Sequence, residues 1–143
     1  MTIPKDLRVG VVRALAVLIL ALTSCAPQTS SEGGKVFFLE PAAGASVSSP
    51  VHVRMAAENF TIEPAGAVKA GAGHLHIIVD GDCVAAGEGV PKDDTHLHFG
   101  QGQTEADLEL ATGSHTLCLQ AADGAHTALA GDGMTQQITI TVE

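Results

Sequence analysis

The sequence predicts an all-β fold, an antiparallel immunoglobulin-like β-sandwich of about seven strands. Short apolar segments recur between clusters of turn residues, at the spacing typical of such sandwiches. Several of these segments alternate apolar and polar residues, and no long segment has a helical period, so helix is limited to a short piece around residues 125–130. A β-barrel is the alternative architecture.

The domain is expected to span residues 35–143, and its strands can be justified in order. Residues 35–40 (KVFFLE) form an apolar run that ends at a proline-containing connector. Residues 51–58 (VHVRMAAE) and 136–142 alternate strictly enough to predict half-buried strands. The remaining strands are short apolar segments bounded by Gly, Asp or Thr: residues 74–80, 95–99, 106–110 and 115–120.

Residues 1–24 resemble a lipoprotein signal peptide. Three basic residues, Lys5, Arg8 and Arg13, accompany a nine-residue apolar run at 14–22 that is too short to span a bilayer. The run ends in LTSC at residues 22–25, which resembles a bacterial lipobox. We therefore expect cleavage before Cys25 and lipidation of its thiol and amine, although an ordinary secretory signal with a stray cysteine is the alternative.

The expected mature protein is an envelope lipoprotein with a flexible tether over residues 25–34. Ala26, not Asp, follows the cysteine, which favours the periplasmic side of the outer membrane or the cell surface. Without the leader the chain keeps four basic and fifteen acidic side chains, a net charge of −11. This balance argues against nucleic acid as a partner, leaves the lipid anchor as the contact with the membrane, and identifies no protein partner.

With Cys25 lipidated, two further cysteines remain, Cys83 and Cys118. Because exported compartments are oxidising, the simplest expectation is a disulfide between them. Two thiolates that bind a soft metal are the alternative.

Two His-Leu-His segments carry the most specific chemistry, GHLHIIVDGDC at residues 73–83 and THLHFG at residues 95–100. Side chains at i and i+2 of a strand share a face, so His74 and His76 point one way while Leu75 and Ile77 point into the core. His96 and His98 share a face in the same manner. If the two strands are neighbours, four imidazoles meet.

Such a set suits copper or zinc and disfavours magnesium or calcium, which prefer oxygen ligands. The alternative is a polar strand face without metal. His115 and His126 are further candidates, and His52 is expected on the polar face of its strand. Nearby aspartates are expected to serve turns or to accept the outer N–H of a ligating imidazole; they are Asp80, Asp82, Asp93 and Asp94.

The glycines beside these segments are not phosphate-binding loops, because neither stretch leads into a helix or carries a lysine. They are Gly71 and Gly73 in one stretch and Gly100 and Gly102 in the other. We expect them to let backbone pass close to the histidines or to turn sharply.

An ordered set of motifs resembles the bacterial exported family known as domain of unknown function 4399, over about residues 36–142. The motifs are VFFLEP (36–41), AENF (57–60), GAGHLH (71–76), PKD (91–93), HLHFGQGQT (96–104) and GSHTL (113–117). The family name implies no activity. Members often carry a further histidine and prolines before the last strand, whereas residues 126–134 here read HTALAGDGM.

A fainter likeness is to copper-zinc superoxide dismutase, in which a His-x-His strand precedes a bridged cysteine, as His74 and His76 precede Cys83 here. The bridging histidine, zinc aspartate and guiding arginine of that enzyme have no convincing counterpart downstream of Cys83. The sequence therefore favours a binding module for metal storage, delivery or tolerance, and not an enzyme. The alternatives are a structural or interaction domain of the cell envelope and, third, a metal-dependent enzyme.

Overall fold

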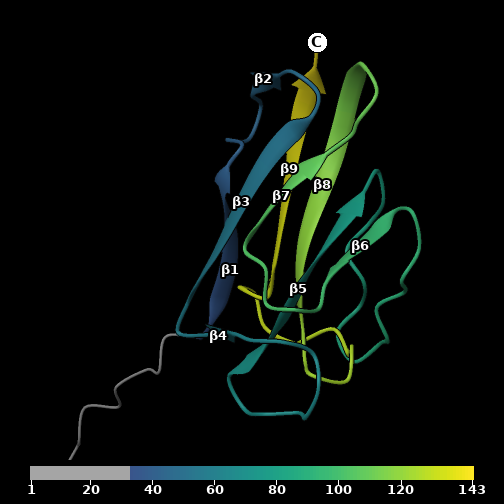
Figure 1. Ribbon diagram of the computed structural model, residues 1–143. Helices are drawn as coiled ribbons and strands as arrows, with labels where there is room; N and C mark the ends of the chain where they lie inside the picture. Colours follow the sequence, from purple (N-terminus) through teal and green to yellow (C-terminus); the bar gives the residue numbers. More distant parts are fainter. Residues whose placement is uncertain (1–32) are drawn as a thin grey trace, which may run out of the picture. The chain divides into compact units, whose positions relative to one another are not determined.

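The computed structural model describes residues 33–143 (Figure 1). The expected signal peptide, the lipidation site Cys25 and the tether up to residue 32 lie outside the described residues. Within residues 33–143, no helix is long and apolar enough to cross a membrane.

The described residues form nine β-strands and no helix, which confirms the all-β prediction. All seven expected strands are present, and two-residue strands at 46–47 and 61–62 add to them. The strands are β1 (Lys35–Glu40), β2 (Ser46–Val47), β3 (Val51–Glu58), β4 (Thr61–Ile62), β5 (Ala72–Val79), β6 (His96–Phe99), β7 (Glu105–Leu108), β8 (Gly113–Ala122) and β9 (Thr135–Val142). The short helix considered around residues 125–130 does not form.

Two sheets build a sandwich (Figure 1). The smaller sheet has the order β1-β3-β7 and is antiparallel throughout. The larger sheet has the order β2-β9-β8-β5, and β4 and β6 both pair with β5. Its long strands are antiparallel, and only the two short strands β2 and β4 run parallel to their neighbours.

The hydrophobic core lies between the inner faces of the two sheets. Its members alternate along each strand, as the period of two requires. The smaller sheet contributes Val51, Val53 and Met55 from β3, and the larger sheet contributes Leu75 and Ile77 of β5, Leu117 and Leu119 of β8, and Ile138, Ile140 and Val142 of β9.

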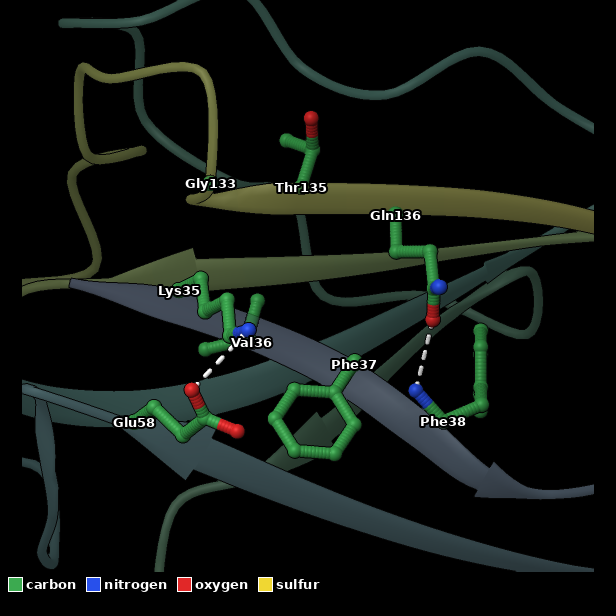
Figure 2. Close-up of a pocket in the computed structure, with 8 residues that line it drawn as sticks. All are labelled: Lys35, Val36, Phe37, Phe38, Glu58, Gly133, Thr135 and Gln136. Carbon is green, nitrogen blue, oxygen red and sulfur yellow. Dashed lines mark hydrogen bonds and ion pairs between the residues drawn. The ribbon is translucent and has the colours of Figure 1, made fainter. Parts of the chain in front are cut away.

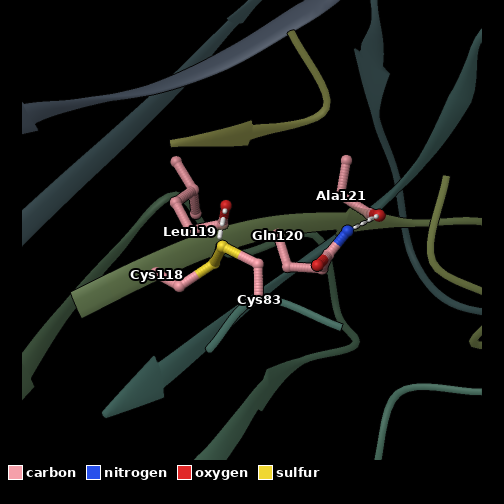
Figure 3. Close-up of a disulfide and its surroundings, with 5 residues drawn as sticks. All are labelled: Cys83, Cys118, Leu119, Gln120 and Ala121. Atoms are coloured by element: carbon pink, nitrogen blue, oxygen red, sulfur yellow. Dashed lines mark hydrogen bonds between the residues drawn. A yellow bond between two sulfur atoms is a disulfide. The ribbon is translucent and has the colours of Figure 1, made fainter. Parts of the chain in front are cut away.

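Over β5 and the end of β8 the outer face of the larger sheet is also covered, by the loops that follow these two strands, whereas the outward positions of β9 are exposed. These loops pair with each other through the isolated bridge between Gly89 and Thr127, and Val90 packs with Ala122 and Ala128 in a second small apolar cluster. A disulfide joins Cys83 of the first loop to Cys118 of β8, as expected (Figure 3). Strand β5 is therefore buried on both of its faces.

Candidate metal centre

The two His-Leu-His segments lie side by side as antiparallel neighbours, β5 and β6. His76 is directly opposite His98 in the register, and Ile78 is opposite His96. Leu75 and Ile77 are completely buried in the core, so the histidines of β5 project from the opposite, outer face of the sheet. The predicted adjacency of the two segments is confirmed.

Three imidazoles come together on this outer face. One ring nitrogen from each of His74, His76 and His98 lies within 4.8 Å of the other two. The Nε2 atoms of His74 and His76 are 3.0 Å apart. Four nitrogens at tetrahedral positions about 2.05 Å from a zinc ion would be about 3.3 Å from one another. The three histidines are therefore close enough together to hold one metal ion.

His126 adds a fourth imidazole from the loop after β8. Its Nε2 lies 2.9 Å from Nε2 of His98, and its ring centre lies 4.7 Å from that of His74 and 5.9 Å from that of His76. The backbone at His126 has a positive φ of 69°, a conformation in which few side chains are found. Two backbone hydrogen bonds hold it there, from its own N–H to the Asp123 carbonyl and from the Val90 N–H to its carbonyl.

His96 shares its strand face with His98 but stands outside the group of three. Its Nδ1 lies 2.9 Å from a carboxylate oxygen of Asp93. The same oxygen accepts the backbone N–H groups of Thr95 and His96, an arrangement that closes the turn before β6. The local turn thus holds the His96 ring, while the next histidine of the strand reaches the cluster.

The other two histidines lie away from the cluster and are paired with aspartates. His115 contacts Asp80 through Nδ1, at 2.8 Å, and the carbonyl of Ala111 through Nε2. His52 contacts Asp107 at 2.7 Å on the exposed surface of the smaller sheet, as its strand position predicts. Of the two further candidates, the structure therefore brings His126 to the cluster and leaves His115 outside it.

Burial favours the neutral form of His74, His76 and His98. The side chains of His74 and His76 are fully buried. Loss of solvation, followed by repulsion from the neighbouring imidazoles, lowers the pKa of His74 to about 4 and that of His76 to about 3. Burial and the nearby His126 also lower the pKa of His98. Because a metal ion binds neutral imidazole, protons do not compete for these nitrogens near neutral pH.

The Nδ1 atoms of His74 and His76, which are not part of the close Nε2 contact, have no carboxylate partner. Asp80 and Asp93 instead bond to His115 and His96, which lie outside the cluster. Asp80 also accepts the backbone N–H of Thr116, and Asp93 closes the turn before β6. Nδ1 of His74 and Nδ1 of His76 are buried without a hydrogen-bond partner, and so is Oε1 of the buried Gln120. Sequence reasoning missed Gln120, because one polar residue at an outward position of β8 looks like any solvent-facing residue.

One glycine makes room for the cluster and another for the backbone of the neighbouring strand, as expected. A Cβ at Gly100 would overlap the ring of His98, and a Cβ at Gly73 would overlap the carbonyl of Ala122 on β8. Gly71 and Gly102 instead have positive φ values of 70° and 77°, and they permit the sharp turns next to β5 and β6.

A groove in the described part of the chain lies away from the cluster. A groove of about 420 Å³ runs between β1 and β9, at the edge where the two sheets meet (Figure 2). There the backbone N–H of Phe38 donates to Oε1 of Gln136, and Lys35 pairs with Glu58. The groove contains no histidine, so it is separate from the cluster.

Residues 53–143 match the model of one protein family, described as Domain of unknown function (DUF4399). The match covers more than half of the chain and includes all four clustered histidines. No curated protein and no solved structure matches the chain.

Proposed function

The chain belongs to the DUF4399 family, whose description assigns no activity, and we propose from its site that it binds one copper or zinc ion. His74, His76 and His98 are the ligands, with His126 as the fourth. The observation that carries this proposal is the convergence of three imidazole nitrogens to within 4.8 Å of one another.

The choice of metal follows from the donor atoms. All four ligands are imidazoles, which suit Zn(II) and Cu(II), whereas Mg²⁺ and Ca²⁺ prefer oxygen. Cys83 and Cys118 form a disulfide, so neither offers a thiolate that would favour Cu(I). Copper(II) binds a given nitrogen site more tightly than zinc does, so supply would decide which ion is bound.

The arrangement favours holding an ion over turning over a substrate. Catalytic zinc sites keep one coordination position open for water or substrate, whereas four protein ligands complete a tetrahedral shell. His74 and His76 have no exposed surface. Together with the expected lipid anchor at Cys25, this supports a role in metal storage, delivery or tolerance at the cell envelope.

Metal titration of the full chain tests the proposal. We expect one Zn(II) or Cu(II) per chain at sub-micromolar affinity, and a loss of at least about 100-fold in the His76→Ala/His98→Ala double variant. His52→Ala is the matched control, because His52 is exposed on the other sheet. Equal uptake by the wild type and the double variant would contradict the proposal.

A structural domain without metal is the second candidate, and one observation favours it. The Nε2 pairs of His74 with His76 and of His98 with His126 are already at hydrogen-bonding distance, 3.0 and 2.9 Å. One neutral ring can donate its N–H to the other in each pair, so the cluster has a stable metal-free form. Absence of uptake by the wild-type chain would establish this alternative.

The lipid anchor has its own test. In a bacterial host fed a labelled fatty acid, we expect the wild-type chain to become labelled and to sediment with membranes. Cys25→Ser should abolish both, because Cys25 carries the acyl chains. Labelling that persists in Cys25→Ser would refute lipidation at this residue.

A further inference from the structure

Gln120 is a fully buried polar residue on the same outer face as the histidine cluster. It lies on β8 directly opposite His76 of β5. Directly opposite residues in an antiparallel pair have Cβ atoms about 4.5–5.5 Å apart, on the same face of the sheet. Gln120 is thus the cross-strand neighbour of His76 on one side, as His98 is on the other.

Only the acceptor end of the Gln120 amide is free. Its amide nitrogen donates to the backbone carbonyl of Ala121, at 3.3 Å (Figure 3). Its Oε1 is buried without a partner. A buried acceptor that stays unpaired costs about 1–3 kcal/mol, so a donor is expected for it.

The ring of His76 also has a buried nitrogen without a hydrogen-bond partner. Its Nε2 faces Nε2 of His74 in the centre of the cluster, and its Nδ1 is buried without a partner. A neutral imidazole carries one proton, on either nitrogen. If Nδ1 carries it, the lone pair of Nε2 points at the metal position.

In the structure neither Oε1 of Gln120 nor Nδ1 of His76 has a hydrogen-bond partner, so the two atoms are not bonded to each other as they stand. We propose that Gln120 is a positioning residue of the metal centre: on a small rotation of the two side chains, its Oε1 accepts the Nδ1–H of His76 and directs the Nε2 lone pair to the ion. The inference rests on the proposed metal-binding function. The same proton assignment fixes the direction of the hydrogen bond in the metal-free cluster. Since Nε2 of His76 then carries no proton, His74 must donate its Nε2–H to it. Partners of this kind fix the tautomer and the ring orientation of ligating histidines.

A neutral amide suits this position better than a carboxylate. The site is completely buried, and an isolated carboxylate there would be costly before metal binds. Gln120 supplies the acceptor without a charge, so the cluster can exist both empty and loaded.

The ring nitrogens of His76 provide a test that needs no metal. In ¹⁵N-labelled full chain without metal, long-range proton–nitrogen spectra should show the Nδ1–H tautomer for His76. Gln120→Leu replaces the amide acceptor with an apolar side chain of similar size. It should shift the His76 ring toward a mixture of tautomers. An Nε2–H tautomer in the wild type, or a tautomer unchanged in Gln120→Leu, would overturn the inference whatever the metal does. If Gln120→Leu does not fold, the wild-type tautomer alone decides.

Zinc titration of the same proteins separates this inference from the proposed function. We expect Gln120→Leu to weaken binding roughly 10-fold or more, Gln120→Glu to restore it, and the matched control Gln137→Leu, at an exposed position of β9, to leave it unchanged. Equal affinity in Gln120→Leu and the wild type would refute the positioning role. Absence of zinc binding by the wild type would instead refute the proposed function.

Discussion

At the scale of single residues, the histidines of β5 make the fold sensitive to acid. The folded chain keeps His74 and His76 neutral down to pH values of about 4 and 3, because burial lowers their pKa. In the unfolded chain both take up a proton near pH 6.5. Between these values the unfolded chain binds more protons, so acid favours unfolding.

We therefore predict that the free energy of unfolding of the metal-free protein is fully maintained above about pH 6.5 and falls as the pH drops toward 4. The loss is on the order of 3 kcal/mol for His74. Urea unfolding at a series of pH values measures it. A His74→Gln/His76→Gln variant should show a flatter profile, whereas His52→Gln should keep the wild-type slope. A wild-type profile that is flat from pH 7 to 4 would contradict the buried neutral pair.

Gly100 is predicted to be required for metal binding, although it contributes no ligand atom. A Cβ there would overlap the ring of His98, so Gly100→Ala should push that ring away from the cluster. We expect zinc affinity to fall at least about 10-fold while the fold is retained. Gly89→Ala is the matched control, because a Cβ at Gly89 meets nothing within 4 Å. Equal affinities in both variants would show that His98 is not a ligand.

The period of two in a strand predicted which face of β5 carries the histidines and which carries Leu75 and Ile77. It could not predict that His98 joins the cluster while His96 does not, because both lie on the same face of the strand. The difference comes from the turn at Asp93, whose carboxylate binds the His96 ring. It could not place His126 either, since an irregular loop has no period. Gln120 was missed because the two covering loops, which make an outward position buried, are not visible in a strand pattern.

At the scale of elements, the disulfide holds the loop after β5 against β8. It joins residues 35 positions apart, and closing a loop of this length in the unfolded chain stabilises the fold by about 3–4 kcal/mol. We predict a loss of that size in Cys83→Ala/Cys118→Ala, measured by urea unfolding under non-reducing conditions. A fully reduced wild type should match the variant. A difference below about 1 kcal/mol would show that the bridge contributes little.

The same loop covers the cluster, so the variant should also bind metal more weakly. Val90 of this loop packs with Ala128 of the loop that carries His126.

Alternation and turn residues predicted all seven longer strands, because each has one face toward the core. The strands β2 and β4 were missed because two residues give no pattern, and the covering loops were missed because their pairing depends on long-range contacts.

At the scale of the whole molecule, β5 lies between two buried layers, the core on one face and the histidine cluster on the other. Leu75 lies in the core, and its neighbour His76 lies in the cluster on the other face. We predict that Leu75→Ala lowers the free energy of unfolding by about 2–5 kcal/mol, because it leaves a cavity in the core. Leu39→Ala, at a position that is half exposed, should change it by less than about 0.5 kcal/mol. Similar losses in both variants would contradict the sandwich core.

The most direct test of the metal centre is X-ray absorption spectroscopy of the zinc-loaded full chain. The account predicts three or four nitrogen ligands at about 2.0–2.1 Å, with the outer-shell scattering of imidazole rings and no sulfur. A shell without imidazole scattering, or one with sulfur at about 2.3 Å, would contradict a site made by His74, His76, His98 and His126.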